Sequence, residues 1–258
     1  MKSIKTNFRV LAASAALLGV ELLGTRPAFA LNYFELEVYP YRTAAKGEFE
    51  LENQTTYSAQ GTRNGKNDGL TRSSLEAVYG VTNKLEVAAY GDFMHAPGGS
   101  WRFAGQRYHA RMSFFQKDQL PVDLGAYVEY EIPQNENGTR EVELRGIMEK
   151  DFGKWTFDIN PIFERAVSGP KVSEGWELQY AAAAIYRLNE RIQPRLEFFG
   201  DFGPINNFEP RDQQKHIVSP AVGIKLGPTF HMLAGVGFGL TRATERRLVR
   251  MQLEWEFY

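Results

Sequence analysis

Apolar and polar residues alternate along most of the chain after about residue 31. The last stretch, RLVRMQLEWEFY (247–258), is the most regular, with Val249, Met251, Leu253, Trp255 and Phe257 at every second position. A period of two residues places these side chains on one face of a strand. No segment after residue 31 shows a comparable helical period. The pattern therefore predicts an all-β protein.

Turn-forming residues divide the chain into alternating segments, and each segment is predicted to be one strand. Short connections and longer Gly- and Pro-containing connections alternate strictly, as expected of an up-and-down antiparallel sheet. Residues 31–46 also alternate in part, so they form either an N-terminal extension at the turn side or an extra strand. The count would be fourteen if one of the predicted segments contained two strands. The twelve predicted strands are 47–57, 70–80, 85–95, 106–116, 121–132, 141–150, 155–166, 176–188, 192–202, 215–226, 230–240 and 247–258.

The predicted strands have the length and the side-chain distribution of a transmembrane barrel. They contain about eleven residues, whereas a tilted strand in a bilayer needs about 9–11 and a strand of a soluble protein usually has about 5–6. Aromatic residues gather near the strand ends and small residues such as Ala126 and Ala182 occupy the middle, which is typical of two interfacial girdles around an apolar band. A soluble sandwich would bury its large rings centrally. We therefore predict a single up-and-down antiparallel transmembrane β-barrel of about twelve strands, with short periplasmic turns and longer extracellular loops.

The regular C-terminal segment fits this architecture. Within lipid, no water satisfies the backbone of an exposed sheet edge, so the last strand must pair with the first. The ending also resembles the C-terminal recognition signal of bacterial outer-membrane proteins, shifted by one residue because Phe257 rather than Tyr258 shares the apolar face. The resemblance implies insertion by the outer-membrane assembly machinery, with outer-membrane lipid as the surroundings.

The first thirty residues have the order of a secretory signal peptide. Lys2 and Lys5 precede an apolar run from Val10 to about Leu23, and small residues stand at Ala28 and Ala30. The run is shorter than the ~20 residues of a membrane-spanning helix. We predict cleavage after Ala30 and export, which leaves residues 31–258 as a barrel in the bacterial outer membrane.

The charged residues are balanced and lie mainly on the predicted inward face. The chain contains 30 Lys and Arg, 31 Asp and Glu, and no Cys, so neither a basic surface for nucleic acid nor a disulfide is expected. Acidic residues outnumber basic ones on the inward face, so an open pore would prefer cations or neutral solutes. The candidate lumen-lining residues are Arg111, Glu129, Glu131, Glu143, Arg145, Asp158, Glu177, Arg195, Glu197, Lys225, Arg250, Glu254, Tyr90, Phe115 and Tyr127.

Two interpretations of this lining remain open. The charges either line a channel or pair across the lumen and fill it, since about twelve strands enclose more space than the eight-stranded barrels that side chains fill. Inward glycines at Gly223, Gly235, Gly237 and Gly239 leave room for a solute or for residues 31–46.

Catalytic and metal chemistry find little support in the sequence. His109 and Ser113 share a face, but four residues along a strand separate them by ~13 Å, too far for a nucleophile and its base. The chain contains no G-x-S-x-G motif and no Cys/His cluster, so we expect no enzyme activity, cofactor or metal site.

A narrower resemblance lies in the stretch VYGVTNKLEVAAYGDF (78–93). This hairpin resembles the turn of an outer-membrane family named for the meta-cleavage pathway of phenol degradation. The resemblance implies a barrel that passes small, often hydrophobic compounds. The expected function is a channel or passive transporter for small hydrophobic or aromatic solutes. The alternatives are a closed barrel that acts through its loops as a structural or binding protein and, with less support, a membrane-embedded hydrolase.

Overall fold

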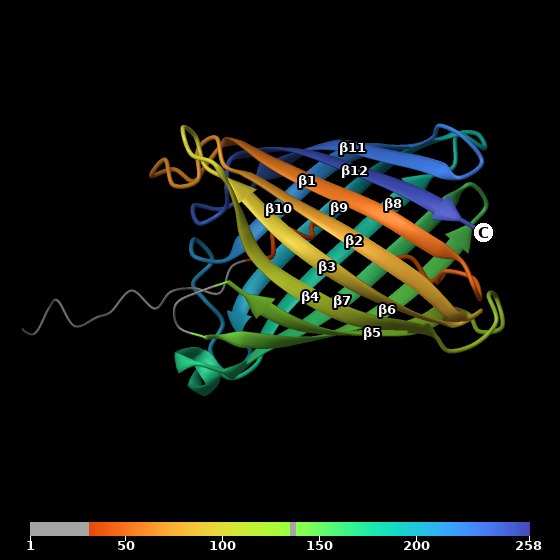
Figure 1. The fold of residues 1–258 in the computed structure, drawn as a ribbon, viewed down its shortest axis with the longest axis horizontal. Helices are drawn as coiled ribbons and strands as arrows, with labels where there is room; N and C mark the ends of the chain where they lie inside the picture. The colour runs from red at the N-terminus through yellow and green to blue at the C-terminus, as the bar shows by residue number, and fades with distance from the viewer. Residues whose placement is uncertain (1–30, 135–137) are drawn as a thin grey trace, which may run out of the picture.

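The computed structural model describes residues 31–134 and 138–258, and these residues form a closed barrel of twelve antiparallel strands (Figure 1). The predicted signal peptide lies outside the described residues. Each strand pairs with its neighbours in sequence, and β1 pairs with β12. The strands are β1 (Phe49–Gln60), β2 (Thr71–Thr82), β3 (Leu85–His95), β4 (Trp101–Ser113), β5 (Asp123–Pro133), β6 (Arg140–Phe152), β7 (Trp155–Ser168), β8 (Glu177–Tyr186), β9 (Ile192–Pro204), β10 (Lys215–Lys225), β11 (Phe230–Gly239) and β12 (Arg247–Phe257).

The pairing of β1 with β12 closes the sheet, as the regular C-terminal pattern predicts. Phe49 lies opposite Phe257 and Tyr57 lies opposite Val249, so the ladder extends over nearly the whole of both strands. The predicted fold class and strand count are confirmed, and the alternative of fourteen strands is wrong. A short 3-10 helix, Pro170–Glu174, lies in the loop between β7 and β8. None of the helices in the described part of the chain has the length and apolar character needed to cross a membrane.

The largest boundary error concerns β4, which was predicted at 106–116 but begins at Trp101 and ends at Ser113. Asp92 lies opposite Gly105 and Phe93 lies opposite Phe103, so an extra residue interrupts the alternation at this point. Such a bulge hides the first part of a strand from a search for strict alternation.

The prediction that Phe115 lines the lumen is also wrong. The strand ends two residues earlier, and Phe115 lies in the turn that follows with 38% of its surface exposed. Its ring packs edge-on against Phe114, with 6.5 Å between the ring centres. Phe115 therefore belongs to the rim at the turn end of the barrel.

The outer and inner faces of the barrel differ as lipid and water require. Outward residues such as Leu75, Trp155 and Trp255 are about half exposed, as expected of side chains that contact lipid. Inward positions carry buried polar and charged side chains, among them Arg107, Glu197 and Asn160.

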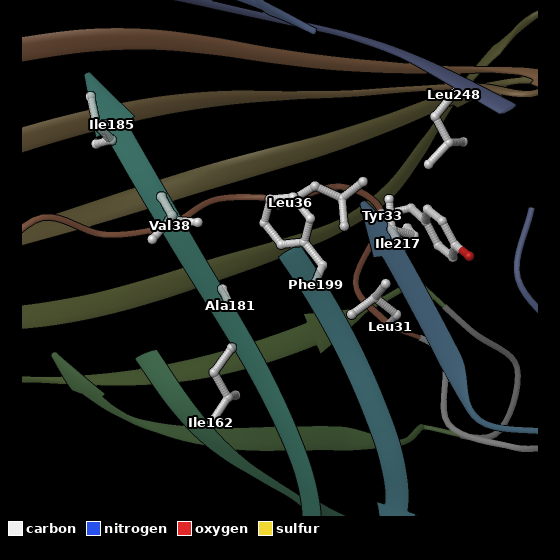
Figure 2. Close-up of a cluster of buried hydrophobic side chains, with 11 residues drawn as sticks. Leu31, Tyr33, Leu36, Val38, Ile162, Ala181, Ile185, Phe199, Ile217 and Leu248 are labelled. Carbon is white, nitrogen blue, oxygen red and sulfur yellow. The ribbon is translucent and has the colours of Figure 1, made fainter. Parts of the chain in front are cut away.

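Residues 31–46 lie inside the barrel and form no thirteenth strand. Leu31, Tyr33, Leu36 and Val38 pack in one apolar cluster with inward side chains of five strands, as Figure 2 shows. The wall residues of this cluster are Ile162, Ala181, Ala183, Ile185, Phe199, Ile217 and Leu248. This sector of the wall is thus apolar because it faces the N-terminal segment rather than water.

Candidate functional site

The N-terminal segment, residues 31–46, runs through the lumen from the loop end to the turn end. At the loop end, the Tyr33 hydroxyl accepts a hydrogen bond from the Glu245 backbone N–H at 3.5 Å. The Arg72 guanidinium lies 4.8 Å from the centre of the Tyr33 ring. At the turn end, the Gly47 N–H donates to the Gly80 carbonyl at 2.8 Å. The segment therefore joins β1 at the turn side but occupies the whole depth of the lumen.

Side chains of the wall satisfy the backbone of this segment. The Tyr39 N–H donates to Asn160 Oδ1 at 2.8 Å, and Asn160 Nδ2 donates to the Tyr39 carbonyl at 3.1 Å. The Tyr41 N–H donates to Glu149 Oε2 at 2.8 Å. An extended chain can thus cross the lumen without a neighbouring strand, because inward polar side chains replace the ladder.

Three inward arginines hold the centre of the segment, and we call Arg107, Arg145 and Arg250 the arginine clamp. The Glu35 carboxylate accepts hydrogen bonds from Arg107 Nη1 and from Arg145 Nη2, the latter at 3.1 Å. Arg250 Nη2 donates to the Leu36 carbonyl. Hydrogen bonds between ionised groups are stronger than neutral ones, so the clamp is the main polar attachment of the segment.

Carboxylates of the barrel wall also form ion pairs with the arginine clamp. Arg107 is fully buried and forms ion pairs with Asp92 at 2.9 Å and with Glu129 at 3.3 Å. Arg250 Nη1 lies 2.5 Å from Glu197 Oε2. Because buried ions are costly unless they are paired, the clamp depends on these carboxylates as well as on Glu35.

An aromatic cluster surrounds Tyr39 of the segment. The Tyr39 hydroxyl lies 2.5 Å from the Tyr90 hydroxyl, and its ring centre lies 4.9 Å from that of Tyr127. The buried His109 ring lies 4.6 Å from the Tyr127 ring. Tyr90 and Tyr127 therefore contact the N-terminal segment instead of lining an empty lumen.

A cavity of about 320 Å³ opens at the turn end, between residues 37–44 and the wall. Strands β1–β4 and β9–β12 contribute to it, and Gly223 adds no side chain to its lining. The other inward glycines leave no comparable space, since a Cβ on Gly237 would lie 3.1 Å from Ile217 and one on Gly239 would lie 2.3 Å from the Glu245 carbonyl.

Acidic side chains dominate the cavity, which is lined by eight glutamates against five Lys and Arg. Glu52 lies directly opposite Glu76 on one neighbouring strand and Glu254 on the other. Carboxylates in register repel one another. Beyond β12, hydrogen bonds to Glu48 and Glu256 raise the pKa of the Tyr258 hydroxyl to about 12. The turn end of the lumen is therefore rich in carboxyl groups.

The fifteen predicted lining residues fall into four sets. Arg111, Arg195, Glu197, Lys225 and Glu254 line the cavity. Glu129, Glu143, Arg145, Arg250, Tyr90 and Tyr127 surround the N-terminal segment. Glu131 lies opposite Arg107, Glu177 lies near the loop end and Asp158 lies near the turn end, the last two buried. Phe115, as described above, lies outside the lumen.

The sequence did not reveal two central residues, Glu35 and Arg107. Arg107 stands four residues before Arg111 on the same face, and this spacing could have identified it as inward. For Glu35 the alternation of the surrounding residues indicates an extended chain but carries no information about its location. Both residues acquire their role through contacts distant in sequence.

Other ionisable groups also cluster in the described part of the chain. His109 lies between Glu76 and Glu86, with each ring nitrogen 3.7 Å from a carboxylate oxygen. Two groups of side chains have the composition of metal ligands, His231 with Glu254 and Glu256, and Glu48 with Glu50 and Glu256.

The sequence profile of the family described as MetA-pathway of phenol degradation matches residues 49–257. The chain belongs to this family. The match covers β1–β12, so the resemblance noted in the β2–β3 hairpin extends to the whole barrel. No curated protein sequence matches the chain significantly.

Solved structures with a similar fold include an outer-membrane channel and a porin. An outer-membrane channel from Pseudomonas putida F1 superposes with a TM-score of 0.61 at 15% identity, over 86% of this chain and 100% of the other. The KdgM porin superposes with a TM-score of 0.55 at 8% identity, over 82% and 99% of the two chains. At these identities the similarity concerns the fold. Family and fold together identify the chain as a barrel of the outer-membrane type.

Proposed function

We propose that the chain is a passive outer-membrane channel for small solutes whose lumen the N-terminal segment controls. One observation supports this proposal above all. Residues 31–46 occupy the lumen beside and above the cavity at the turn end, and packing, hydrogen bonds and ion pairs hold them against the wall without a disulfide crosslink. A barrel filled permanently by its own wall would need no separate segment.

The chemistry of the cavity defines the solutes that we propose. Its excess of glutamates favours cations and neutral molecules over anions. Val38, Tyr39 and Leu233 add apolar and aromatic surface to the same cavity. We therefore propose small neutral or cationic solutes, including aromatic ones, in agreement with the phenol-degradation pathway for which the family is described.

Ion conductance in a planar bilayer tests the proposal. The mature chain is compared with a variant that lacks residues 31–46, and a variant with Glu35→Gln serves as an intermediate. We expect conductance to rise in the order intact chain, substituted chain, shortened chain, because each change weakens the obstruction. In a salt gradient, the reversal potential should show preference for K⁺ over Cl⁻. Flux of a neutral aromatic compound into liposomes should follow the same order.

The alternative to a channel is a closed barrel that acts through its loops as a structural or binding protein. If both the intact and the shortened chain are electrically silent and impermeable, the channel proposal is wrong and this alternative takes its place. We also propose that the outer-membrane assembly machinery inserts the chain, with β12 as the strand that it recognises.

A further inference from the structure

Three side chains with metal-ligand chemistry meet at the turn-end mouth of the cavity. His231 comes from β11, and Glu254 and Glu256 come from β12. His231 Nδ1 lies 3.6 Å from Glu254 Oε1 and 3.7 Å from Glu256 Oε1. One ligand atom from each residue lies within 4.8 Å of the other two.

These distances suit a shared cation better than direct hydrogen bonds. A hydrogen bond between nitrogen and oxygen requires about 2.7–3.2 Å. Zinc binds histidine nitrogen and carboxylate oxygen at about 2.0–2.2 Å, so two ligands of a tetrahedral centre are roughly 3.3–3.6 Å apart. The distances from His231 Nδ1 to Glu254 and Glu256, 3.6 Å and 3.7 Å, lie at the upper end of this range or just above it, and all three ligand atoms lie within 4.8 Å of one another. A metal ion between the three groups therefore requires only that their side chains move closer together.

The barrel ladder fixes the three ligands in this arrangement. His231 and Glu254 are direct partners across β11 and β12, and Glu256 follows two residues later on the same face. His231 Nε2 is buried and has no hydrogen-bond partner among the described residues, while Nδ1 faces the two carboxylates. The imidazole is therefore positioned by the wall and directed toward the acidic pair.

We propose that His231, Glu254 and Glu256 bind a divalent transition-metal ion such as Zn²⁺ at the turn-end mouth. Two carboxylates and one neutral imidazole balance the charge of the ion, and the adjoining cavity leaves a fourth position for water. The site goes beyond the proposed channel function and does not depend on conduction.

Arg42 of the N-terminal segment competes for the same carboxylate. Its Nη2 lies 3.7 Å from Glu256 Oε1, the oxygen that faces His231, and 3.4 Å from Glu48 Oε1. The Arg42 side chain is 63% exposed, so it can withdraw into solvent when an ion binds. Metal binding therefore releases one contact between the segment and the wall.

Titration of the purified full-length mature barrel with Zn²⁺ alone, followed by calorimetry, tests the site. We expect one ion per chain, at least tenfold weaker binding after His231→Ala or Glu254→Gln, and unchanged binding after His95→Ala. His95 is a matched control because it lies at the loop end against Trp101. Arg42→Ala should tighten binding several-fold. Binding should weaken in acid, because the ligands must be deprotonated.

Cobalt substitution supplies a second measurement. Co²⁺ should give visible ligand-field absorption in the unaltered chain and lose its intensity in the His231→Ala variant. Heat-modifiable migration on a gel verifies that each variant is a folded barrel. Equal Zn²⁺ binding with and without His231, or no binding by the folded chain, would overturn the proposal. Unchanged affinity for Zn²⁺ in Arg42→Ala would show that Arg42 does not compete with the ion for Glu256. A conducting barrel without Zn²⁺ binding removes only this inference, and a silent barrel that binds Zn²⁺ removes only the channel.

Discussion

The two ends of the lumen arrange the same kinds of side chain differently. At the loop end and in the centre, carboxylates meet arginines: Glu35 contacts Arg107 and Arg145, and Glu245 lies 2.7 Å from Arg72. At the turn end, Glu52, Glu76 and Glu254 stand side by side in register around a cavity.

This difference distinguishes the part of the lumen in which paired charges stabilise the packing from the part in which we propose that a ligand binds. Paired buried charges are hard to separate, because removing one partner leaves the other unsatisfied. Carboxylates in register repel one another, and a cation relieves that repulsion. Paired charges at the loop end and in the centre therefore help to hold the N-terminal segment, and we propose that the carboxylates at the turn end attract positive charge. Four pairs of variants measure this difference.

Docking of the segment can be followed directly because the chain contains no Cys. Val38→Cys places a single thiol at a position that is 4% exposed, so its labelling rate reports how often the segment leaves the wall. A change of 1.4 kcal/mol in docking corresponds to about a tenfold change in that rate.

Arg107→Ala should have the largest effect. It leaves Glu35, Asp92 and Glu129 without their shared partner, and breaking a buried ion pair costs about 3–5 kcal/mol. Thiol labelling should become roughly a hundredfold faster or more, and conductance should rise. Arg63→Ala, in an exposed loop, is the control and should change neither. Unchanged labelling in Arg107→Ala would show that the arginine clamp does not hold the segment.

Glu35→Gln and Glu37→Gln form a matched pair two residues apart. Glu35 accepts from two guanidinium groups, whereas Glu37 accepts from the amides of Gln54 and Gln252. A hydrogen bond to a charged group is worth about 1.5–3 kcal/mol, so Glu35→Gln should speed labelling about 10- to 100-fold. Glu37→Gln should change it less than about threefold. The comparison between the two halves fails if both substitutions act equally.

Gly80→Ala should disturb the turn-side anchor of the segment. A Cβ at Gly80 would lie 1.8 Å from the Ala45 carbonyl oxygen, so the backbone of the segment must move. Overpacking of this kind costs about 1–3 kcal/mol, so labelling of the thiol in Val38→Cys should become faster. Gly223→Ala is the control, because its Cβ would lie 3.7 Å from the nearest atom. Equal labelling in the two variants would place the anchor elsewhere.

Glu52→Gln should have the smallest effect on stability and a measurable effect on selectivity. It removes the central charge of the in-register row, which should stabilise the barrel by about 0.2–1 kcal/mol in urea unfolding. The preference for K⁺ over Cl⁻ should decrease, as read from the reversal potential. Glu190→Gln, in an exposed turn, should leave both quantities unchanged. An increase in cation preference would contradict the proposal that the glutamates of the cavity favour cations.

Much of the barrel could be predicted because strand alternation is a local property. The positions of Glu129 and Arg250 on the inward face follow from the period of two, and so does the closing strand β12. The start of β4 could not be predicted, because the bulge near Gly105 breaks that period. Phe115 was misplaced for a different reason, because β4 ends at Ser113 and the alternation does not mark that end.

The location of residues 31–46 could not be read from their pattern. Their alternation arises because an extended chain lies between two unlike surfaces, with Glu35 toward the arginine clamp and Leu36 toward the apolar cluster. Inward charges could be assigned to a face, but their partners could not. Glu245 reaches Arg72 across 173 positions of the chain.

The sequence by itself determined a closed barrel with an apolar exterior and a charged interior, since lipid and backbone hydrogen bonding impose a period of two on every strand. Only the tertiary structure decided which charges are neutralised, where the cavity lies and what occupies the lumen. Those features depend on distances between residues that barrel closure brings together, and a local pattern does not encode such distances.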